Sequence, residues 1–140
     1  MATTDCSISK VCSDCREPLP LEAFRCDRSR RDGHDHLCRE CRTYYMLRWR
    51  YGISRERYEQ LLVQQNGVCA ICRAGETAKM YGKVTKLAVD HCHSSGEIRG
   101  LLCANCNIIL GRAQDSIETL RAAIKYLEAP PTCILARDGQ

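Results

Sequence analysis

The chain has 140 residues, a formal net charge of +4, a single Phe and a single Trp. This length accommodates one domain or two very small ones, and the scarcity of large aromatic side chains excludes an extensive hydrophobic core. The apolar runs fall short of the roughly 20 residues that span a bilayer, so we expect no membrane association. The mild positive charge favours a polyanionic partner.

Twelve cysteines must therefore help to hold the fold, either as a secreted disulfide framework or as an intracellular metal protein. Residues 1–10 lack the apolar segment of a secretory signal, and we expect a reducing, cytoplasmic environment. Eight of the cysteines form four C-x-x-C pairs, a spacing typical of tetrahedral zinc sites. These pairs are Cys12/Cys15, Cys38/Cys41, Cys69/Cys72 and Cys103/Cys106.

The first two pairs lie within residues 11–43, for which we expect a zinc knuckle or ribbon with Phe24 packed beneath its loop. The middle of this segment, residues 25–36, is dense in charge, which predicts a turn or flexible loop rather than a core element. His34 or His36 could replace a cysteine as a zinc ligand, and the spacing leaves this alternative open.

Two helices are predicted next. The first covers residues 42–51 and ends at Gly52, and the second covers residues 55–65 with Ser54 as its N-cap. Tyrosines and Trp49 interleave with basic residues in and before the first helix, a pattern that fits either stacking on bases or packing of the helix.

Arginines near these helices could bind DNA phosphates and give a salt-sensitive, sequence-independent affinity. Acidic residues lie among them, so an ordinary solvated surface is the alternative. The arginines that we predict to bind DNA are Arg25, Arg28, Arg30, Arg31, Arg42, Arg48, Arg50 and, further along the chain, Arg99.

The second half of the chain carries the remaining cysteine pairs. We expect a loop over residues 74–83, strands over 85–90 and 98–102, and a short helix over 105–110 that ends at Gly111. Asp115 should cap a C-terminal helix. Its apolar stripe fits packing within the chain or, alternatively, a dimer interface, and consists of Ile117, Leu120, Ile124 and Leu127.

The most informative residues lie between the third and fourth cysteine pairs. A zinc ion bound by those pairs would place the segment containing Asp90, His91 and His93 beside Asn107. A neutral imidazole can accept a proton from water near neutral pH, and the side-chain oxygens of Asp90 and Asn107 suit Mg²⁺. Neighbouring residues face opposite sides of a strand, so Asp90 and His91 can converge only where the strand ends or bends.

This region resembles the recombination endonuclease VII family of HNH, or ββα-metal, nucleases. The resemblance covers about residues 51–128 and rests on several motifs. They are Tyr51-Gly52-Ile53-Ser54, Asn66-Gly67-Val68-Cys69-Ala70-Ile71-Cys72, Val89-Asp90-His91-Cys92-His93, Arg99-Gly100-Leu101-Leu102-Cys103 and Cys106-Asn107.

The resemblance implies a DNA endonuclease in which His91 activates water as the general base. Asp90 and Asn107 would bind a catalytic Mg²⁺ or Mn²⁺, and His93 would contact the scissile phosphate. One structural zinc would be held by Cys69, Cys72, Cys103 and Cys106. The substrate would be duplex, nicked or branched DNA, with RNA open as an alternative, in a bacterial or phage-infected cell.

One position departs from the family member that resolves DNA junctions as a homodimer. Leu110 stands where that member has an acidic residue, so the resemblance carries nuclease chemistry further than junction specificity. A homodimer is therefore a possibility rather than an implication. The alternative function is a non-catalytic, zinc-binding DNA adaptor with a vestigial HNH site, against which the intact Asp90, His91 and Asn107 argue.

These inferences combine into a small, zinc-stabilised α+β fold. We expect an N-terminal zinc-binding unit over residues 1–50, with a basic loop and a linker helix. An HNH endonuclease VII-like domain follows over residues 51–129, with a ββα-metal core flanked by helices, and residues 130–140 form a flexible tail. The expected cofactors are two structural Zn²⁺ ions and one catalytic Mg²⁺ or Mn²⁺ ion.

Overall fold

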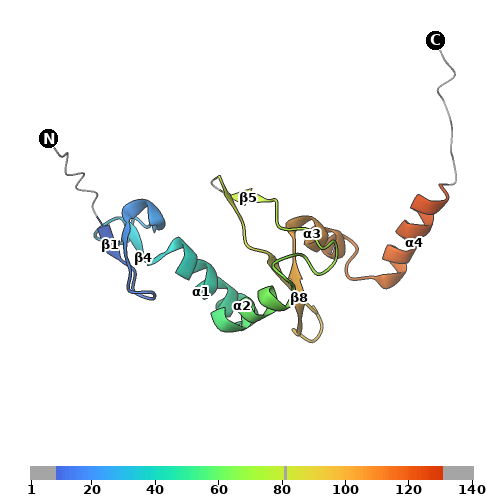
Figure 1. The fold of residues 1–140 in the computed structure, drawn as a ribbon, viewed down its shortest axis with the longest axis horizontal. Coiled ribbons are helices and arrows are strands. Elements are labelled where there is room, and N and C mark those ends of the chain that lie inside the picture. The colour runs from blue at the N-terminus through green and yellow to red at the C-terminus, as the bar shows by residue number, and fades with distance from the viewer. Residues whose placement is uncertain (1–8, 81, 131–140) are drawn as a thin grey trace, which may run out of the picture. The chain divides into compact units, whose positions relative to one another are not determined.

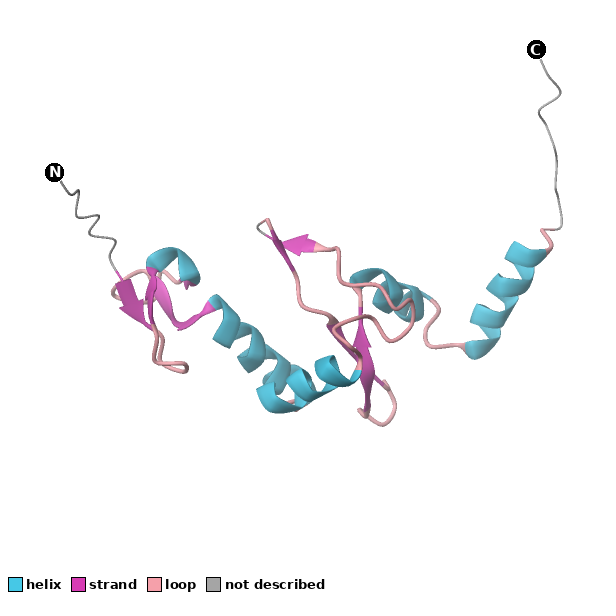
Figure 2. Cartoon of the chain, in the orientation of Figure 1, coloured by secondary structure: helices cyan, strands magenta, loops and turns pink. Residues whose placement is uncertain are grey.

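The computed structural model describes residues 9–80 and 82–130, which contain four α-helices, one 3₁₀ turn and eight short strands (Figures 1 and 2). Within these residues the strands pair into four separate two-stranded sheets. Helices and small sheets thus form the α+β fold that the sequence predicts. The predicted tail over residues 130–140 lies, apart from its first residue, outside the described part of the chain.

Contacts divide the chain into two compact units. The first unit comprises residues 9–64 and 91–98, and the second comprises residues 65–90 and 99–130, apart from residue 81. Each unit contains one group of four cysteines. The domain boundary expected after residue 50 stays a prediction, because these units are defined by contacts alone.

The first unit begins with two hairpins. Strands β1 (Ser9–Val11) and β2 (Pro18–Pro20) pair antiparallel, and the 3₁₀ turn η1 (Leu21–Ala23) leads into a second antiparallel pair, β3 (Phe24–Cys26) and β4 (His34–Cys38). The loop expected over residues 25–36 is therefore partly wrong, since strands form at both of its ends. Charged residues tolerate such a small sheet because its outer face stays in water.

The core of the first unit surrounds Phe24, which is 1% exposed, as the sequence predicts. It packs with Leu37 and three buried cysteines. Asp35 on β4 is also buried, and its Oδ1 accepts a hydrogen bond from the backbone N–H of Leu37 at 3.2 Å. So small a core leaves much of the stability to the cysteine group.

Two helices complete the first unit. Helix α1 (Arg39–Tyr51) starts three residues before the predicted position, because the Sγ of Cys38 caps its N-terminus. It ends at Gly52, which has the left-handed φ of 65° that a glycine adopts without strain. Helix α2 (Arg55–Gln64) is capped by the hydroxyl of Ser54, as predicted. The rings of Tyr44 and Tyr58 pack edge to face with centroids 5.9 Å apart.

Two further hairpins follow, and all of their strand residues except His91 and Ile98 belong to the second unit. Strands β5 (Lys79–Met80) and β6 (Lys83–Val84) pair antiparallel where the sequence predicts only a loop. Strand β7 (Ala88–His91) pairs with β8 (Ile98–Leu102). The predicted first residues of β7 are wrong, because the amide and hydroxyl of Thr85 both donate to the carbonyl oxygen of Ala78.

Helices α3 (Ala104–Arg112) and α4 (Ile117–Glu128) follow β8. Gly111 lies inside α3, so the helix end predicted there is wrong. The cap of α4 is Ser116, whose hydroxyl accepts from the backbone N–H of Thr119, and not Asp115 as predicted. Strands β7 and β8 and helix α3 therefore follow one another in ββα order.

Hydrogen bonds from two polar side chains tie the second unit together around its buried apolar residues. The Gln65 amide donates to the carbonyls of Val68 and Leu101 and accepts from the backbone N–H of Leu101. The Glu76 carboxylate accepts from the N–H of Ala104 at the start of α3. The buried apolar side chains are Leu87, Val89, Leu101 and Leu102.

The apolar stripe of α4 is not buried. Ile117, Ile124 and Leu127 are 60%, 56% and 77% exposed. The predicted packing of this stripe within the chain is therefore wrong for Ile117, Ile124 and Leu127, whereas Leu120 is half-buried. The alternative dimer interface stays a prediction.

Candidate metal centres and active site

Both sets of cysteines predicted to bind zinc come together in space. The first cysteine group is Cys12, Cys15, Cys38 and Cys41, and the second cysteine group is Cys69, Cys72, Cys103 and Cys106. In each group the four Sγ atoms lie within 4.8 Å of one another. Tetrahedral zinc with Zn–S bonds of about 2.3 Å needs sulfurs about 3.8 Å apart. The Sγ atoms of Cys72 and Cys103 are 3.8 Å apart, so the donor set fits zinc.

The two groups share one local design. In each, the first pair lies in a knuckle turn in which the backbone N–H of the fourth residue after the first cysteine donates to that cysteine's carbonyl, at 3.0 Å. That residue, Arg16 or Arg73, has a positive φ. The second pair starts a helix, where the N–H of Cys41 or Cys106 donates to the Sγ of the preceding cysteine. Partial positive charge at a helix N-terminus favours thiolates there.

Within each group the surroundings lower the pKa of one cysteine and raise that of another. Burial disfavours ionisation of Cys12, but backbone donors led by Cys38 outweigh it and lower the pKa of Cys12 to about 6. The pKa of Cys69 is likewise about 6, with burial outweighed by backbone donors led by Cys103. Burial and the neighbouring thiols raise the pKa of Cys106 to about 12. A bound divalent cation would stabilise the thiolate form of the cysteines whose pKa is raised, such as Cys106.

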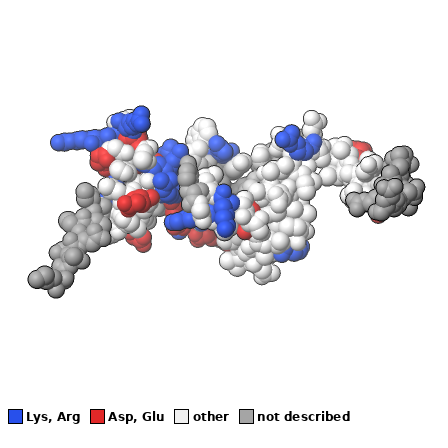
Figure 3. Space-filling model, turned by 90° about the horizontal axis from the view of Figure 1, so that it is seen from above, with Lys and Arg blue, Asp and Glu red and all other residues white. Residues whose placement is uncertain are grey.

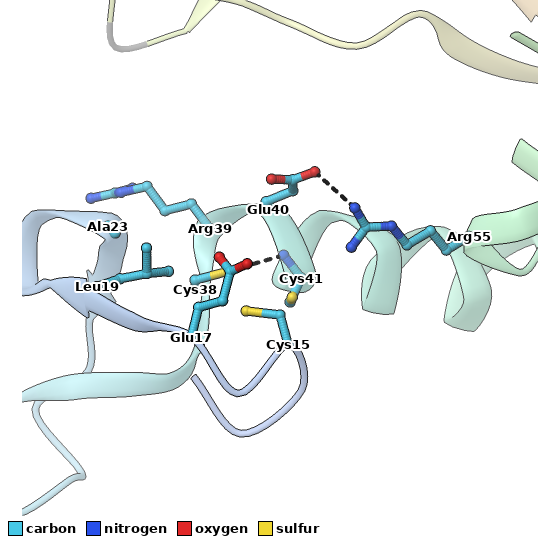
Figure 4. A pocket seen from close by; sticks show the side chains of 9 residues that line it. All are labelled: Cys15, Glu17, Leu19, Ala23, Cys38, Arg39, Glu40, Cys41 and Arg55. Carbon is cyan, nitrogen blue, oxygen red and sulfur yellow. Dashed lines mark hydrogen bonds and ion pairs between the residues drawn. The ribbon is translucent and has the colours of Figure 1, made fainter. Parts of the chain in front are cut away.

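The open alternative of a histidine ligand in the first cysteine group is wrong, because the four clustered donors are all cysteines. His36 instead places its Nδ1 3.0 Å from the Asp35 carboxylate. The first group borders a cavity of about 240 Å³. Figure 4 shows Cys15, Cys38 and Cys41 among the side chains that line it, together with the ion pair between Glu40 and Arg55, whose atoms lie 3.2 Å apart. None of the predicted catalytic residues lines this cavity, so we do not assign it to substrate.

The predicted catalytic strand ends at His91, the last residue of β7, which meets the condition for Asp90 and His91 to converge. The next turn repeats the knuckle design: the N–H of Gly96 donates to the carbonyl of Cys92 at 2.7 Å, and Gly96 has a φ of 72°. The rings of His91 and His93 lie 5.0 Å apart, on one side of the chain as predicted. The ring of Tyr51 lies 5.1 Å from His91.

Asp90 is 9% exposed and its carboxylate is bound by Arg99 through two hydrogen bonds. The Arg99 Nε donates to Oδ2 at 2.8 Å and the Nη2 donates to Oδ1 at 2.9 Å. The same Nη2 donates to Oδ1 of Asp115 at 3.1 Å. These hydrogen bonds, first to Asp90 and then to Asp115, raise the pKa of Arg99. Arg99 thus carries a fixed positive charge between two carboxylates.

Asn107 lies in α3, directly after the cysteine ligand Cys106, and is half-buried. Its backbone N–H donates to the carbonyl of Cys103, so the helix fixes its position relative to the second cysteine group. Within the described residues, the contacts of Asp90 lead to Arg99 and none joins Asp90 to Asn107. The joint binding of a divalent ion by Asp90 and Asn107 therefore stays a prediction.

The arginines predicted to bind DNA fall into two sets. Three are engaged by carboxylates: Arg30 lies 3.6 Å from Asp27, Arg42 lies 3.6 Å from the buried Asp35, and Arg99 binds Asp90. The others are exposed in the first unit, and they are Arg25, Arg28, Arg31, Arg48 and Arg50. On the face seen in Figure 3, basic and acidic side chains are interspersed. The structure leaves the first set less able than the second to bind phosphate.

The aromatic side chains of α1 are partly buried in the core and partly exposed to solvent. Tyr44 is 8% exposed and belongs to the core, whereas Trp49 and Tyr45 are 74% and 52% exposed. The exposed rings could stack on bases, and the guanidinium of Arg42 lies over the Tyr45 ring at 5.3 Å. Packing of the helix is thus confirmed for Tyr44, whereas base stacking by Tyr45 and Trp49 stays a prediction.

Sequence reasoning did not find the contacts of Tyr51 and Asp115. Tyr51 was expected to stack on bases or pack the helix, but its ring faces His91. The only sequence signal was its place in the Tyr51-Gly52-Ile53-Ser54 motif of the resembled family. Asp115 was expected to cap a helix, and nothing in the local sequence distinguishes a cap from a partner of Arg99.

A hairpin followed by a helix, with a four-cysteine group that includes the cap of that helix, defines a small zinc-binding ββα protein. Sequence comparison gives the family. A family model described as recombination endonuclease VII matches residues 44–129. The chain therefore belongs to the recombination endonuclease VII family.

Individual relatives come from phages. Over 82 residues the chain is 48% identical to the Gene 59 protein of Mycobacterium phage D29 and 45% identical to the Gene 59 protein of Mycobacterium phage L5. The match covers 58% of this chain and 47% of each relative, so the chain spans about half the length of these curated relatives.

One solved structure is also similar, that of the ββα-Me type II restriction endonuclease Hpy99I. It shares 26% sequence identity, covers 86% of this chain and 65% of its own, and superimposes with a TM-score of 0.36. Separately, no helix in the described residues has the length and apolar character needed to cross a membrane.

Proposed function

We propose that this protein is an HNH endonuclease that uses a divalent metal ion to hydrolyse phosphodiester bonds in DNA. The observation that carries the proposal is the family match over residues 44–129, within which Asp90, His91 and Asn107 are all present. Asp90 and His91 end the strand β7, and Asn107 follows a cysteine of the second cysteine group.

The oxygen donors of Asp90 and Asn107 would hold Mg²⁺ or Mn²⁺, which are hard cations with a preference for such ligands. Arg99 occupies one lone pair on each oxygen of Asp90 and leaves another on each for a cation, because a carboxylate offers about four acceptor sites. When bound, the ion would polarise the phosphate and stabilise the leaving oxygen.

His91 would act as the general base and accept a proton from the attacking water. Its ring is half-buried, and its centroid lies 5.1 Å from that of Tyr51 and 5.0 Å from that of His93. His93 is exposed beside His91 and would contact the scissile phosphate.

The exposed arginines and Trp49 on α1 would bind most of the DNA. Arg48 and Arg50 flank Trp49 in sequence, so phosphate contacts and base stacking could come from the same stretch of helix. Arg25 on β3, with Arg28 and Arg31 in the turn between β3 and β4, would add further phosphate contacts. Arg30, Arg42 and Arg99 would do so only by leaving their carboxylate partners.

The test is nicking of supercoiled plasmid by zinc-loaded protein with added Mg²⁺ or Mn²⁺. The wild type should nick, and His91→Ala should lose cleavage while it keeps zinc and DNA binding. His34→Ala is the matched control. His34 starts β4, its Nδ1 contacts the backbone oxygen of Asp32 at 2.8 Å, and it is not a predicted catalytic residue, so this variant should cleave normally. Cleavage by His91→Ala at the wild-type rate would refute the assigned base.

The rival function, a non-catalytic DNA adaptor, predicts a DNA mobility shift with no cleavage under any divalent ion. A second comparison addresses the substrate: rates on a four-way junction, a nicked duplex, a linear duplex and an RNA duplex of matched sequence. Equal rates on junction and linear duplex would exclude a dedicated junction resolvase.

A further inference from the structure

The Asp90 carboxylate is bound by Arg99, and Arg99 is bound in turn by Asp115. Arg99 lies on β8, the strand paired with β7, and binds both oxygens of Asp90 in a side-on fork. Such bidentate pairs fix orientation as well as charge. Arg99 donates its third hydrogen bond to a residue outside the hairpin: its Nη2 lies 3.1 Å from the Asp115 Oδ1 that accepts.

The backbone of Asp115 and of the residue before it has positive φ angles, which are uncommon for non-glycine residues. Asp115 lies in the turn between α3 and α4, where Gln114 and Asp115 have φ values of 52° and 56°. Left-handed backbone is unfavourable for residues that carry a Cβ, and here two such residues follow one another. Such strain persists when surrounding interactions determine it, and it concentrates at functional sites. Here the turn directs the Asp115 carboxylate to the guanidinium that holds Asp90.

The charges of this triad also suit a cation. Asp90 and Asp115 together carry two negative charges and Arg99 one positive charge, so the triad keeps a net charge of about −1 beside a candidate Mg²⁺ ligand. A lone Arg99–Asp90 pair would be neutral, and a lone Asp90 would be free to rotate. Asp115 thus allows Arg99 to fix the Asp90 carboxylate while the region stays attractive to a divalent ion.

We propose that Asp115 is a positioning residue for the catalytic metal ion: it anchors Arg99, and Arg99 orients the Asp90 carboxylate so that its unused lone pairs face the ion. This inference rests on the proposed function, because it assumes that Asp90 binds the catalytic ion. It also assigns Arg99 to the support of that ligand rather than to DNA.

The test is direct binding of Mn²⁺ to zinc-loaded protein, followed by the electron paramagnetic resonance signal of free Mn²⁺. The key variant is Asp115→Gly, because glycine adopts the positive φ without strain while the whole side chain, with its carboxylate, is lost. We expect its Mn²⁺ affinity to fall about tenfold, the lower end of the effect of removing a residue that supports a metal ligand. Asp115→Asn keeps an acceptor for Arg99 and should lose less.

Gln114→Gly is the matched control, since it makes the same backbone change one residue earlier without touching Arg99, and it should bind Mn²⁺ like the wild type. Cleavage by Asp115→Gly should recover at about tenfold higher Mn²⁺, as expected for a defect in metal binding. Equal losses in Gln114→Gly and Asp115→Gly would overturn the inference, since the turn rather than the carboxylate would be responsible.

Two further outcomes separate this inference from the function on which it rests. Wild-type Mn²⁺ affinity in Asp115→Gly, together with lost affinity in Asp90→Asn, would overturn the role of Asp115 alone. Unchanged Mn²⁺ binding in Asp90→Asn would overturn the proposed catalytic metal site itself.

Discussion

Removal of one thiolate from the second cysteine group should abolish both zinc binding by that group and the activity of the proposed active site. Cys103 is the informative position, because it is 6% exposed, belongs to the cysteine group and caps α3. Serine is itself a favoured N-cap, so Cys103→Ser retains a cap and removes the thiolate. Asn107 donates its backbone N–H to the carbonyl of residue 103 and therefore depends on this turn.

The magnitude follows from the four-sulfur geometry. Structural zinc sites contribute about 10–16 kcal/mol of apparent binding free energy, which an equal division over four thiolates sets at about 2.5–4 kcal/mol each. A loss of that size weakens zinc binding by about 10²–10³-fold. It also approaches the lower end of the total stability of a small domain, which is about 5–15 kcal/mol. The second unit should therefore partly unfold even while the first unit keeps its zinc.

Elemental analysis after dialysis against a mild chelator provides the assay. The wild type should retain two zinc ions per chain, one for each of the two cysteine groups, and Cys103→Ser should retain one. Cys26→Ser is the matched control: Cys26 is exposed and lies outside both groups, so this variant should retain both ions. DNA cleavage should be lost in Cys103→Ser even at saturating Mn²⁺. Full zinc content in Cys103→Ser would refute the reasoning.

Three other predictions concern the core, the proposed base and DNA binding. Leu101→Ala, at a position that is 0% exposed, should lower the free energy of unfolding of the zinc-loaded protein by about 2–5 kcal/mol in denaturant titrations, and a loss below about 1 kcal/mol would contradict this packing. Tyr51→Leu should slow cleavage with zinc content and DNA affinity unchanged, because it removes the ring that faces His91; a normal rate would exclude this role. Arg48→Gln combined with Arg50→Gln should reduce the salt dependence of DNA affinity by about two phosphate contacts, and an unchanged slope would place the DNA elsewhere.

Much of this protein could be predicted from sequence because the decisive signals are local. A C-x-x-C pair places its two thiols in one turn whatever the rest of the chain does, and both cysteine groups assemble as expected. Ser54 and Gly52 mark helix ends through bonds to residues within one turn, and the structure has these ends. The family was equally accessible, because its motifs are short runs of residues.

Sequence reasoning was less successful at helix ends where neighbouring residues could take the same role. Gly111 was expected to end α3, but a glycine costs a helix only about 1 kcal/mol and the helix continues through it. Asp115 was expected to cap α4, but Ser116 takes that role.

Tertiary structure alone decided which long-range partners the charged and aromatic residues find. The sequence predicted Arg99 to bind DNA, yet the pairing of β7 with β8 and the path of the chain after α3 place it between Asp90 and Asp115. The ring contact of Tyr51 with His91 joins residues forty positions apart. Such contacts depend on where distant backbone segments lie, whereas zinc knuckles and caps depend on dihedral angles within a few residues. The sequence therefore determined the metal scaffold, and the fold determined what surrounds the candidate catalytic residues.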